Sequence, residues 1–206
     1  MSNAVWISKA PIDPTIVRSL THSKLQQDLD SVVDVSTRNM AGEPLPPELF
    51  PTSMEYKPDN SSSKALPDLF KGGGQWVVSG KCAAVMRRFD LGNGNLYPVD
   101  IRSAASTGAT GDSYFCLNFG NVKKALLPNE SVGLRPAPGG RWSPRATFVD
   151  DDIALSTVAL SGPDIWLDPA MPLTFFFGGG LMEALSEASA DRGFGAHSPL
   201  RRCRIV

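Results

Sequence analysis

The stretch Gln75–Ile101, QWVVSGKCAAVMRRFDLGNGNLYPVDI, reads as a complete strand–helix–strand unit. Trp76-Val77-Val78 is a short apolar run of residues that favour strands. Ser79 has the residue type and the place of a helix N-cap. The apolar residues after it recur at helical spacing, i, i+3, i+4 and i+7: Cys82, Val85, Met86 and Phe89. Glycines and asparagines at 92–95 tolerate positive φ and stop the helix, so the chain resumes a strand at Leu96–Ile101.

A weaker version of this unit lies near the C-terminus. Thr174–Phe177 is strand-like, and Gly178–Gly180 is interpreted as the turn into a helix that ends before Gly193. The apolar face of that helix consists of Leu181, Leu185 and Ala188. Neither unit contains a chemical motif, so both inform us about the fold alone.

The remaining periodic segments are short. Five of them are typical of strands: Ala4–Lys9, Ser113–Phe119, Arg145–Val149, Ala154–Leu160 and Asp164–Leu167. In Ser113–Phe119, alternation places Tyr114, Cys116 and Asn118 on one face. Gly162-Pro163 is expected to join the last two strands as a hairpin. Helical segments are expected at Ser23–Val33, Leu66–Phe70 and Asn121–Leu127.

Short strands in antiparallel-looking runs, with a few inserted helices, predict an α+β fold. With 206 residues the chain fits a single domain, 1–206, with mainly antiparallel short strands and two strand–turn–helix units. Its N-terminal third is rich in proline and irregular. Within it, Asn39–Lys71 is a Pro/Ser-rich excursion, interpreted as a surface segment or partly mobile linker that proteases should cut first near Asp59–Ser63. Ser103–Asp112 is expected to be a loop.

Composition is that of an ordinary globular protein, and it excludes some classes. Lys and Arg number 20 against 21 Asp and Glu, so the net charge is −1 and no basic face for nucleic acid is expected. The apolar runs are too short to cross a bilayer and no targeting segment opens the chain, so we expect a cytoplasmic protein without a membrane partner. The three cysteines, Cys82, Cys116 and Cys203, are expected to be free, buried and reduced.

The chain carries no convincing catalytic, cofactor or metal motif. Gly178–Gly180 lacks the Lys-Ser/Thr of a phosphate loop, so a turn or helix-entry role is the better interpretation. Ser79 lacks the first glycine of a nucleophile elbow. His22 and His197 are expected to be surface residues, and the cysteine spacing matches no compact zinc motif. We therefore predict no cofactor.

The clearest charge run is Asp150-Asp151-Asp152, beside the expected hairpin that carries Trp166. Two interpretations stay open. These four residues form a partner-binding patch, in which the carboxylates attract a basic partner and the indole anchors it. Alternatively, the aspartates are solvated and Trp166 belongs to the core.

The order of elements resembles a bacterial family first classed as a domain of unknown function and later grouped with immunity proteins of polymorphic toxin systems. The resemblance rests on WVVSGKCAAVMRRFD at Trp76–Asp90, the LYPVDI and SYFCLNF strands, and the closing LTFFFGGGLMEALSEA and GFGAHSPL segments. It covers the chain from about Leu66 onward. In similar proteins a serine usually precedes the second helix, where this chain has Gly178–Gly180.

This resemblance implies a non-enzymatic protein that binds and neutralises a cognate toxin. Such binding needs a complementary surface and no nucleophile or metal. The alternative is a small-molecule-binding protein or enzyme whose site is assembled from scattered residues such as Asp112, Tyr114 and His197. A neighbouring gene for a large secreted protein would favour the first reading, and a deep polar pocket the second.

Overall fold

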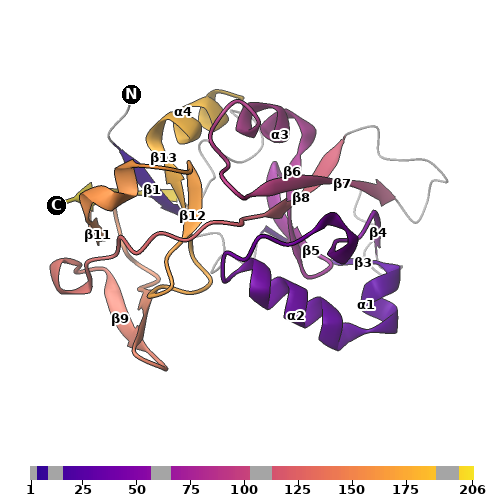
Figure 1. Cartoon of the computed structure of the whole chain (residues 1–206), viewed down its shortest axis with the longest axis horizontal. Helices are drawn as coiled ribbons and strands as arrows, with labels where there is room; N and C mark the ends of the chain where they lie inside the picture. Colours follow the sequence, from indigo (N-terminus) through magenta and orange to yellow (C-terminus); the bar gives the residue numbers. More distant parts are fainter. Residues whose placement is uncertain (1–3, 9–15, 57–65, 103–112, 189–199) are drawn as a thin grey trace.

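The computed structural model describes residues 4–8, 16–56, 66–102, 113–188 and 200–206 (Figure 1). The helices in these ranges are α1 (Ser23–Gln27), α2 (Leu29–Asn39), α3 (Gly80–Met86) and α4 (Gly179–Ala188), with 3₁₀ turns at Pro47–Leu49, Pro128–Glu130 and Thr157–Leu160. The strands are β1 (Val5–Ser8), β2 (Val17–Arg18), β3 (Leu20–Thr21), β4 (Ser53–Tyr56), β5 (Leu69–Gly72), β6 (Gln75–Ser79), β7 (Asn95–Arg102), β8 (Tyr114–Asn118), β9 (Leu134–Ala137), β10 (Arg141–Pro144), β11 (Ala154–Leu155), β12 (Ile165–Leu167), β13 (Phe175–Gly178) and β14 (Leu200–Ile205).

Two mixed but mainly antiparallel sheets organise these elements. The larger has the order β2-β5-β6-β8-β7-β4-β3, and the smaller has the order β11-β14-β1-β13-β12. Strand β1 lies between β13 and β14, with Val5 opposite both Gly178 and Cys203. The N-terminal strand is thus held in place by the last part of the chain. Strands β9 and β10 form a separate hairpin. The predicted α+β class is confirmed.

Side chains alternate between cores on the two faces of each sheet. In β13, Phe175 and Phe177 belong to a core that contains residues of both sheets, whereas Phe176 belongs to a core on the other face of the smaller sheet. The first of these, which we call the shared core, also includes Trp76, Leu117 and Phe119. Because β6 and β13 are covered on both faces, they read as continuous apolar runs.

The two strand–turn–helix units meet at their helices. Helix α3 follows β6, helix α4 follows β13, and the two helices contact one another above the shared core (Figure 1). Ser79 caps α3 as predicted, since its Oγ accepts a hydrogen bond from the Cys82 N–H at 3.4 Å. The cap Oγ also donates to the buried Asp68 carboxylate at 2.6 Å. Ser79 is therefore a structural residue.

Two details of these units differ from expectation. Helix α3 ends at Met86, so Phe89 lies in the following turn and is only half-buried. Gly178 is the last residue of β13 and α4 begins directly at Gly179, so the helix-entry interpretation of Gly178–Gly180 is confirmed and the alternative of a turn between strand and helix is wrong. A Cβ on Gly178 would lie 2.5 Å from Asp164 Oδ1, so a larger residue there would require the Asp164 carboxylate to move.

The helix expected over Ser23–Val33 is broken at Asp28. The Asp28 backbone is not helical there, with φ −150° and ψ 85°, and its carboxylate accepts from the Ser31 N–H at 3.0 Å. This side chain caps a second helix, so α1 and α2 run separately. The spacing of apolar residues does not indicate this break, because leucines and valines continue at helical intervals on both sides of Asp28.

Five short segments also differ from prediction. Leu66–Phe70 leads into strand β5 with Leu69 and Phe70 buried, and Asn121–Leu127 is extended with bridges to β12 and β11. Arg145–Val149 is a turn beyond hairpin β9–β10, and Thr157–Leu160 is a 3₁₀ turn. Gly162-Pro163 joins no hairpin, because β12 pairs with β13 and β11 with β14. Long-range strand pairing accounts for Leu66–Phe70, Asn121–Leu127 and Gly162-Pro163.

The Pro/Ser-rich segment Asn39–Lys71 is less peripheral than its composition indicates. Leu45, Phe50 and Met54 are buried, and β4 pairs in parallel with β7. The expected cleavage region, Asp59–Ser63, and the expected loop Ser103–Asp112 lie outside the described residues. The three cysteines form no disulfide and are buried, as predicted, and burial raises the pKa of the Cys116 thiol to about 12. No helix in the described ranges has the length and apolarity to cross a membrane.

His22 is buried, although the sequence indicated a surface residue. Its Nδ1 accepts from the Leu25 N–H at 3.2 Å, which caps α1, and its Nε2 lies 2.9 Å from the Gly73 carbonyl oxygen. An amide can only donate and a carbonyl can only accept, so the neutral Nε2–H tautomer satisfies both partners. Burial lowers the pKa of His22 below 6.5, and the charge of Lys24 adds to this effect.

We expect His22 to make the fold less stable in acid. Because its pKa is lower in the folded state, the unfolded chain takes up the proton first, and stability falls as pH drops below about 6.5. The variant His22→Asn keeps an N-cap acceptor and removes the titration. Urea unfolding at about pH 7.5 and about pH 5.5 should show a larger loss for the parent protein than for the variant. Equal losses would mean that His22 is solvated.

Candidate partner-binding groove

An apolar groove of about 660 Å³ lies where the two sheets meet, between α2 and the loop that joins β12 to β13. We call it the α2 groove. One wall comes from α1, α2 and the turn that follows α2: Leu25, Leu29, Val33, Ser36, Thr37, Met40 and Ala41. The facing wall comes from Leu167–Pro169, Pro172 and Leu173, with Lys71, Gly74 and Arg141 completing the lining. Both walls belong to well-anchored parts of the fold.

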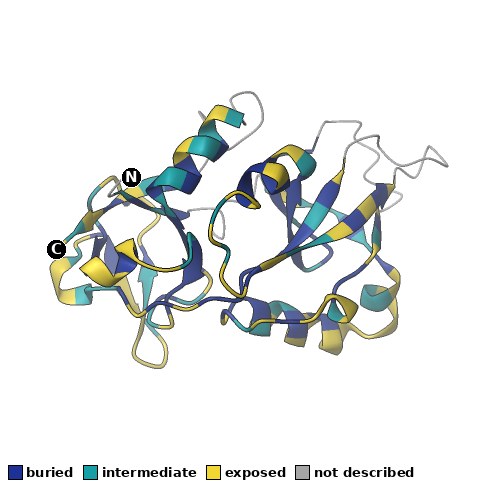
Figure 2. Cartoon of the chain, turned by 45° about the horizontal axis from the view of Figure 1, so that its top comes forward, coloured by how far each residue is buried: buried dark blue, intermediate teal, exposed yellow. Residues whose placement is uncertain are grey.

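Helix α2 has more apolar residues than its packing needs. Val32 and Val35 are buried, whereas Leu29 and Val33 are 59% and 55% exposed. Leu29 and Val33 are four residues apart and share a helix face. Figure 2 shows exposed residues along the outer side of this helix. The helix therefore presents a second apolar surface, and the α2 groove lies beside it.

The facing loop is fixed by Asp168, which is 2% exposed. Its Oδ2 accepts from the Ala125 and Leu126 N–H groups at 2.8 Å each, and its Oδ1 accepts from the Ala170 N–H at 2.9 Å. The Trp142 N–H of hairpin β9–β10 donates to the Ala170 carbonyl at 2.7 Å. These bonds connect three separate chain segments and hold the wall in one conformation.

Leu173 is the unusual residue of this wall. Its φ is +65°, in the left-handed region, and its side chain is 61% exposed. A left-handed conformation costs a non-glycine residue roughly 1–2 kcal/mol, and glycine or asparagine would adopt it more easily. An exposed leucine gains little burial to offset that cost. Stability alone gives no reason for leucine here, which marks Leu173 as a functional candidate.

The rim of the α2 groove is basic. Lys71 and Arg141 line it, and the carboxylate among the described lining residues, Asp168, is buried and accepts three backbone N–H groups. The floor includes Met40, whose sulfur accepts from the Trp76 Nε1–H at 3.2 Å. The groove thus combines apolar walls with two accessible cations.

The acidic run lies elsewhere, and its carboxylates have internal partners. The Arg202 guanidinium donates to both carboxylate oxygens of Asp151 and holds the pKa of that carboxyl below its usual value. Asp150 accepts from the Arg202 N–H at 2.9 Å, and Asp152 accepts from the Val149 N–H at 2.9 Å. Asp151 also has positive φ, +66°. The run forms a turn that is joined to β14.

Trp166 is not part of a surface patch. It is fully buried in β12 and stacks on Phe176 with ring centroids 5.6 Å apart. The prediction of an exposed indole anchor is therefore wrong, because β12 is covered on both faces. The alternative interpretation, in which Trp166 belongs to the core, is confirmed. Trp166 and the three aspartates do not form one exposed surface. Partner binding by Asp150–Asp152 stays a prediction.

The structure describes only Tyr114 of the three residues named for the scattered-residue alternative, so that alternative stays a prediction. Tyr114 is buried, with its ring edge-on to Phe70 at 5.9 Å, while Asp112 and His197 lie outside the described residues. The described residues also contain no group of three or more His, Cys, Asp or Glu side chains that could hold a metal ion.

Sequence reasoning missed the α2 groove. Leu29 and Val33 carried a signal, since they fall on a second apolar face next to the buried one. Leu173 carried none, because positive φ at leucine cannot be inferred from its neighbours. The chain is therefore an α+β protein with an apolar groove whose rim carries Lys71 and Arg141. The sequence matches no protein-family model and no curated protein.

Proposed function

We propose that this protein is a non-enzymatic immunity protein, which binds a cognate toxin in the cytoplasm and neutralises it, and that the toxin docks in the α2 groove. The observation that carries the docking site is the exposed, strained Leu173 opposite the exposed face of α2. The toxin as partner rests on the resemblance to immunity proteins. A binding function requires surface complementarity and no catalytic group.

The α2 groove has the features of an interface centre. Binding hot spots are apolar anchors in a well-packed depression, surrounded by a polar rim. Leu29, Val33 and Leu173 are such anchors, and they stand on elements that are fixed before binding. A preformed surface loses little conformational entropy on association. The α2 groove would be the centre of an interface of about 800 Å² per partner.

The charges at the rim of the α2 groove determine which kind of toxin segment fits it. Lys71 and Arg141 form an accessible cationic rim, so the toxin segment that fits carries apolar side chains next to a carboxylate. A basic segment would meet two like charges there. We therefore expect an acidic–apolar docking segment on the toxin.

The test is co-expression with the toxin domain encoded by the adjacent gene, together with affinity measurement on the purified pair. The variant Leu29→Gln/Val33→Gln/Leu173→Asn removes the apolar anchors and keeps conformations that each new residue tolerates. We expect the parent protein to restore growth. The variant should lose protection and bind at least about 100-fold more weakly, since each anchor contributes more than about 1 kcal/mol.

A matched control makes the result specific. Val132 and Val149 are 72% and 56% exposed and lie outside the α2 groove, so Val132→Thr/Val149→Thr should bind the toxin like the parent protein. All variants should retain the parent melting temperature within a few degrees. Full protection by the triple variant would remove the α2 groove as the site. Absence of binding by the parent protein would refute the immunity function with this partner.

A further inference from the structure

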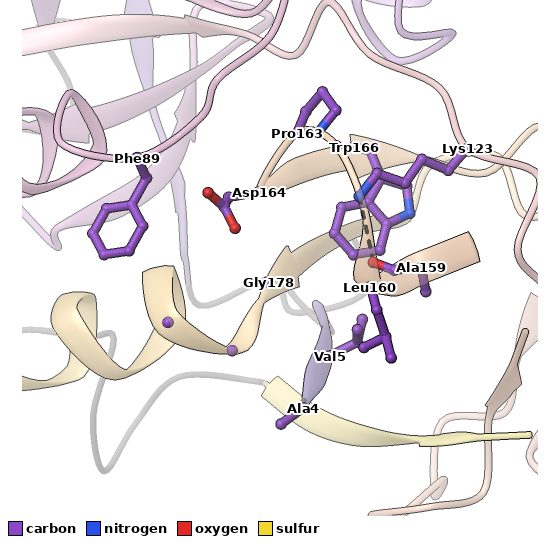
Figure 3. Close-up of a pocket in the computed structure, with 13 residues that line it drawn as sticks. Ala4, Val5, Phe89, Lys123, Ala159, Leu160, Pro163, Asp164, Trp166 and Gly178 are labelled. Atoms are coloured by element: carbon purple, nitrogen blue, oxygen red, sulfur yellow. Dashed lines mark hydrogen bonds between the residues drawn. The ribbon is translucent and has the colours of Figure 1, made fainter. Parts of the chain in front are cut away.

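A second, smaller cavity of about 380 Å³ lies on the smaller sheet, away from the α2 groove. Figure 3 shows Lys123 reaching across the face of Trp166, with Asp164, Leu160 and the start of α4 around the same space. Apolar side chains of Val5, Leu160 and Pro163 line much of it. Lys123 is only 9% exposed. A buried lysine in an open cavity needs an explanation.

Lys123 is poorly satisfied by the protein. Its Nζ lies 3.7 Å from the centroid of the Trp166 ring, and its hydrogen bond to the Ala159 carbonyl oxygen is long, at 3.4 Å. No carboxylate lies within 4 Å of it among the described ion pairs. An ammonium has three N–H donors, so Lys123 keeps donor capacity for a ligand. Burial lowers its pKa to about 8, against the opposing charges of Asp164 and Asp90.

The opposite wall combines a positive feature, the start of helix α4, with one carboxylate, Asp164. Gly179 and Gly180 begin the ten-residue helix α4 and line the cavity without side chains. The first N–H groups of a helix carry partial positive charge and have no partner within the helix. Asp164 lies against this helix start, where Gly178 N–H donates to its carbonyl oxygen at 2.8 Å. One Oδ of Asp164 already accepts from the Asp90 N–H at 3.0 Å.

We propose that this cavity binds a small organic carboxylate with an apolar body, whose carboxylate pairs with Lys123 and whose body fills the space beside Leu160 and Pro163. The volume suits a compact ligand, at the small end of ordinary pockets. A doubly charged phosphate fits less well, because Asp164 repels a double charge more strongly than the single charge of a carboxylate and because phosphate has no apolar body for the apolar walls. The site goes beyond toxin binding, since it shares no lining residue with the α2 groove.

Sodium benzoate is the probe, with benzamide as its neutral analogue and inorganic phosphate as the comparison anion. In NMR titrations of the whole chain, benzoate should shift the Lys123 and Trp166 side-chain signals saturably and raise the pKa of Lys123. Its affinity should fall as pH rises through about 8, where the ammonium loses its proton. Benzamide and phosphate should cause no such shifts.

The variant Lys123→Met keeps the stem of the side chain and removes its charge. It should bind benzoate at least about tenfold more weakly and melt at the parent temperature or higher, because a buried charge without an ion-pair partner is removed. Gly180→Ala narrows the cavity at a position where a Cβ meets Phe89 at an ordinary 3.5 Å, so it should fold and also bind weakly. Parent-like benzoate binding by both variants, no benzoate binding by the parent protein, or phosphate binding in its place would overturn the proposal.

Discussion

Replacing Phe175 by alanine is expected to lower the free energy of unfolding by about 3–5 kcal/mol, the usual cost of deleting a fully buried phenylalanine. Phe175 is completely buried in the shared core. Its ring centroid lies 5.1 Å from that of Trp76, 4.9 Å from Phe119 and 5.6 Å from Phe177. Trp76 belongs to the larger sheet and Phe177 to the smaller one. The cavity left by the substitution would therefore open where the two sheets meet, and neither can move to fill it alone.

Phe89→Ala is the matched control. That ring is half-buried in a turn beyond α3, so its removal should cost clearly less, roughly 1–2 kcal/mol. Urea unfolding of both variants measures the difference, with an unchanged dependence on urea concentration showing that both unfold from the same state. An equal loss of stability in the two variants would mean that the shared core stabilises the fold no more than the turn after α3 does.

Asn39→Ala is expected to lower the free energy of unfolding by about 2–4 kcal/mol, because it leaves several buried polar groups unpaired. Asn39 is 1% exposed at the end of α2. Its Oδ1 accepts from the Phe119 N–H at 2.9 Å and from Asn118 Nδ2 at 3.0 Å, and its Nδ2 donates to the Leu117 carbonyl at 2.8 Å. One amide thus attaches α2 to strand β8, about 80 residues away in sequence.

The control is Asn95→Ala. Asn95 is exposed and its side chain donates a long bond, 3.3 Å, to the carbonyl of Asn93 nearby. Its loss should change stability by less than about 0.5 kcal/mol, as expected for a surface residue. Calorimetric melting of both variants gives the comparison. A small effect at Asn39 would mean that water replaces the side chain, and the link between α2 and the larger sheet would then be weaker than its geometry implies.

The two candidate sites contribute to stability differently from these core residues. Leu173 and Lys123 each carry a local cost, one in backbone conformation and one in the burial of a charge. Variants at these positions are therefore expected to retain or gain stability while losing binding. Replacing a structural residue lowers stability, whereas replacing one of these residues should leave stability unchanged or raise it. A melting measurement distinguishes the two cases, so both experiments above include one.

How far the sequence predicts this fold depends on the range of the interactions involved. The cap at Ser79 and the alternation in Tyr114–Asn118 were read correctly. The cap depends on contacts within three residues, and the alternation on a period of two. The burial of Trp166 was one of two open interpretations. The break at Asp28 was missed, because aspartate caps a helix only when the preceding backbone leaves the helical conformation.

By itself, the sequence determined the α+β class, the strand–helix units and the buried cysteines, since each follows from local composition and apolar periodicity. Tertiary structure alone decided which strands pair, as when Val5 lies between Gly178 and Cys203. It also decided that Leu173 is strained and exposed, and that Lys123 is buried against Trp166. These properties arise between residues that are distant in the chain. The local sequence pattern carries no information about such contacts. Both candidate sites consist of residues that only these long-range contacts bring together.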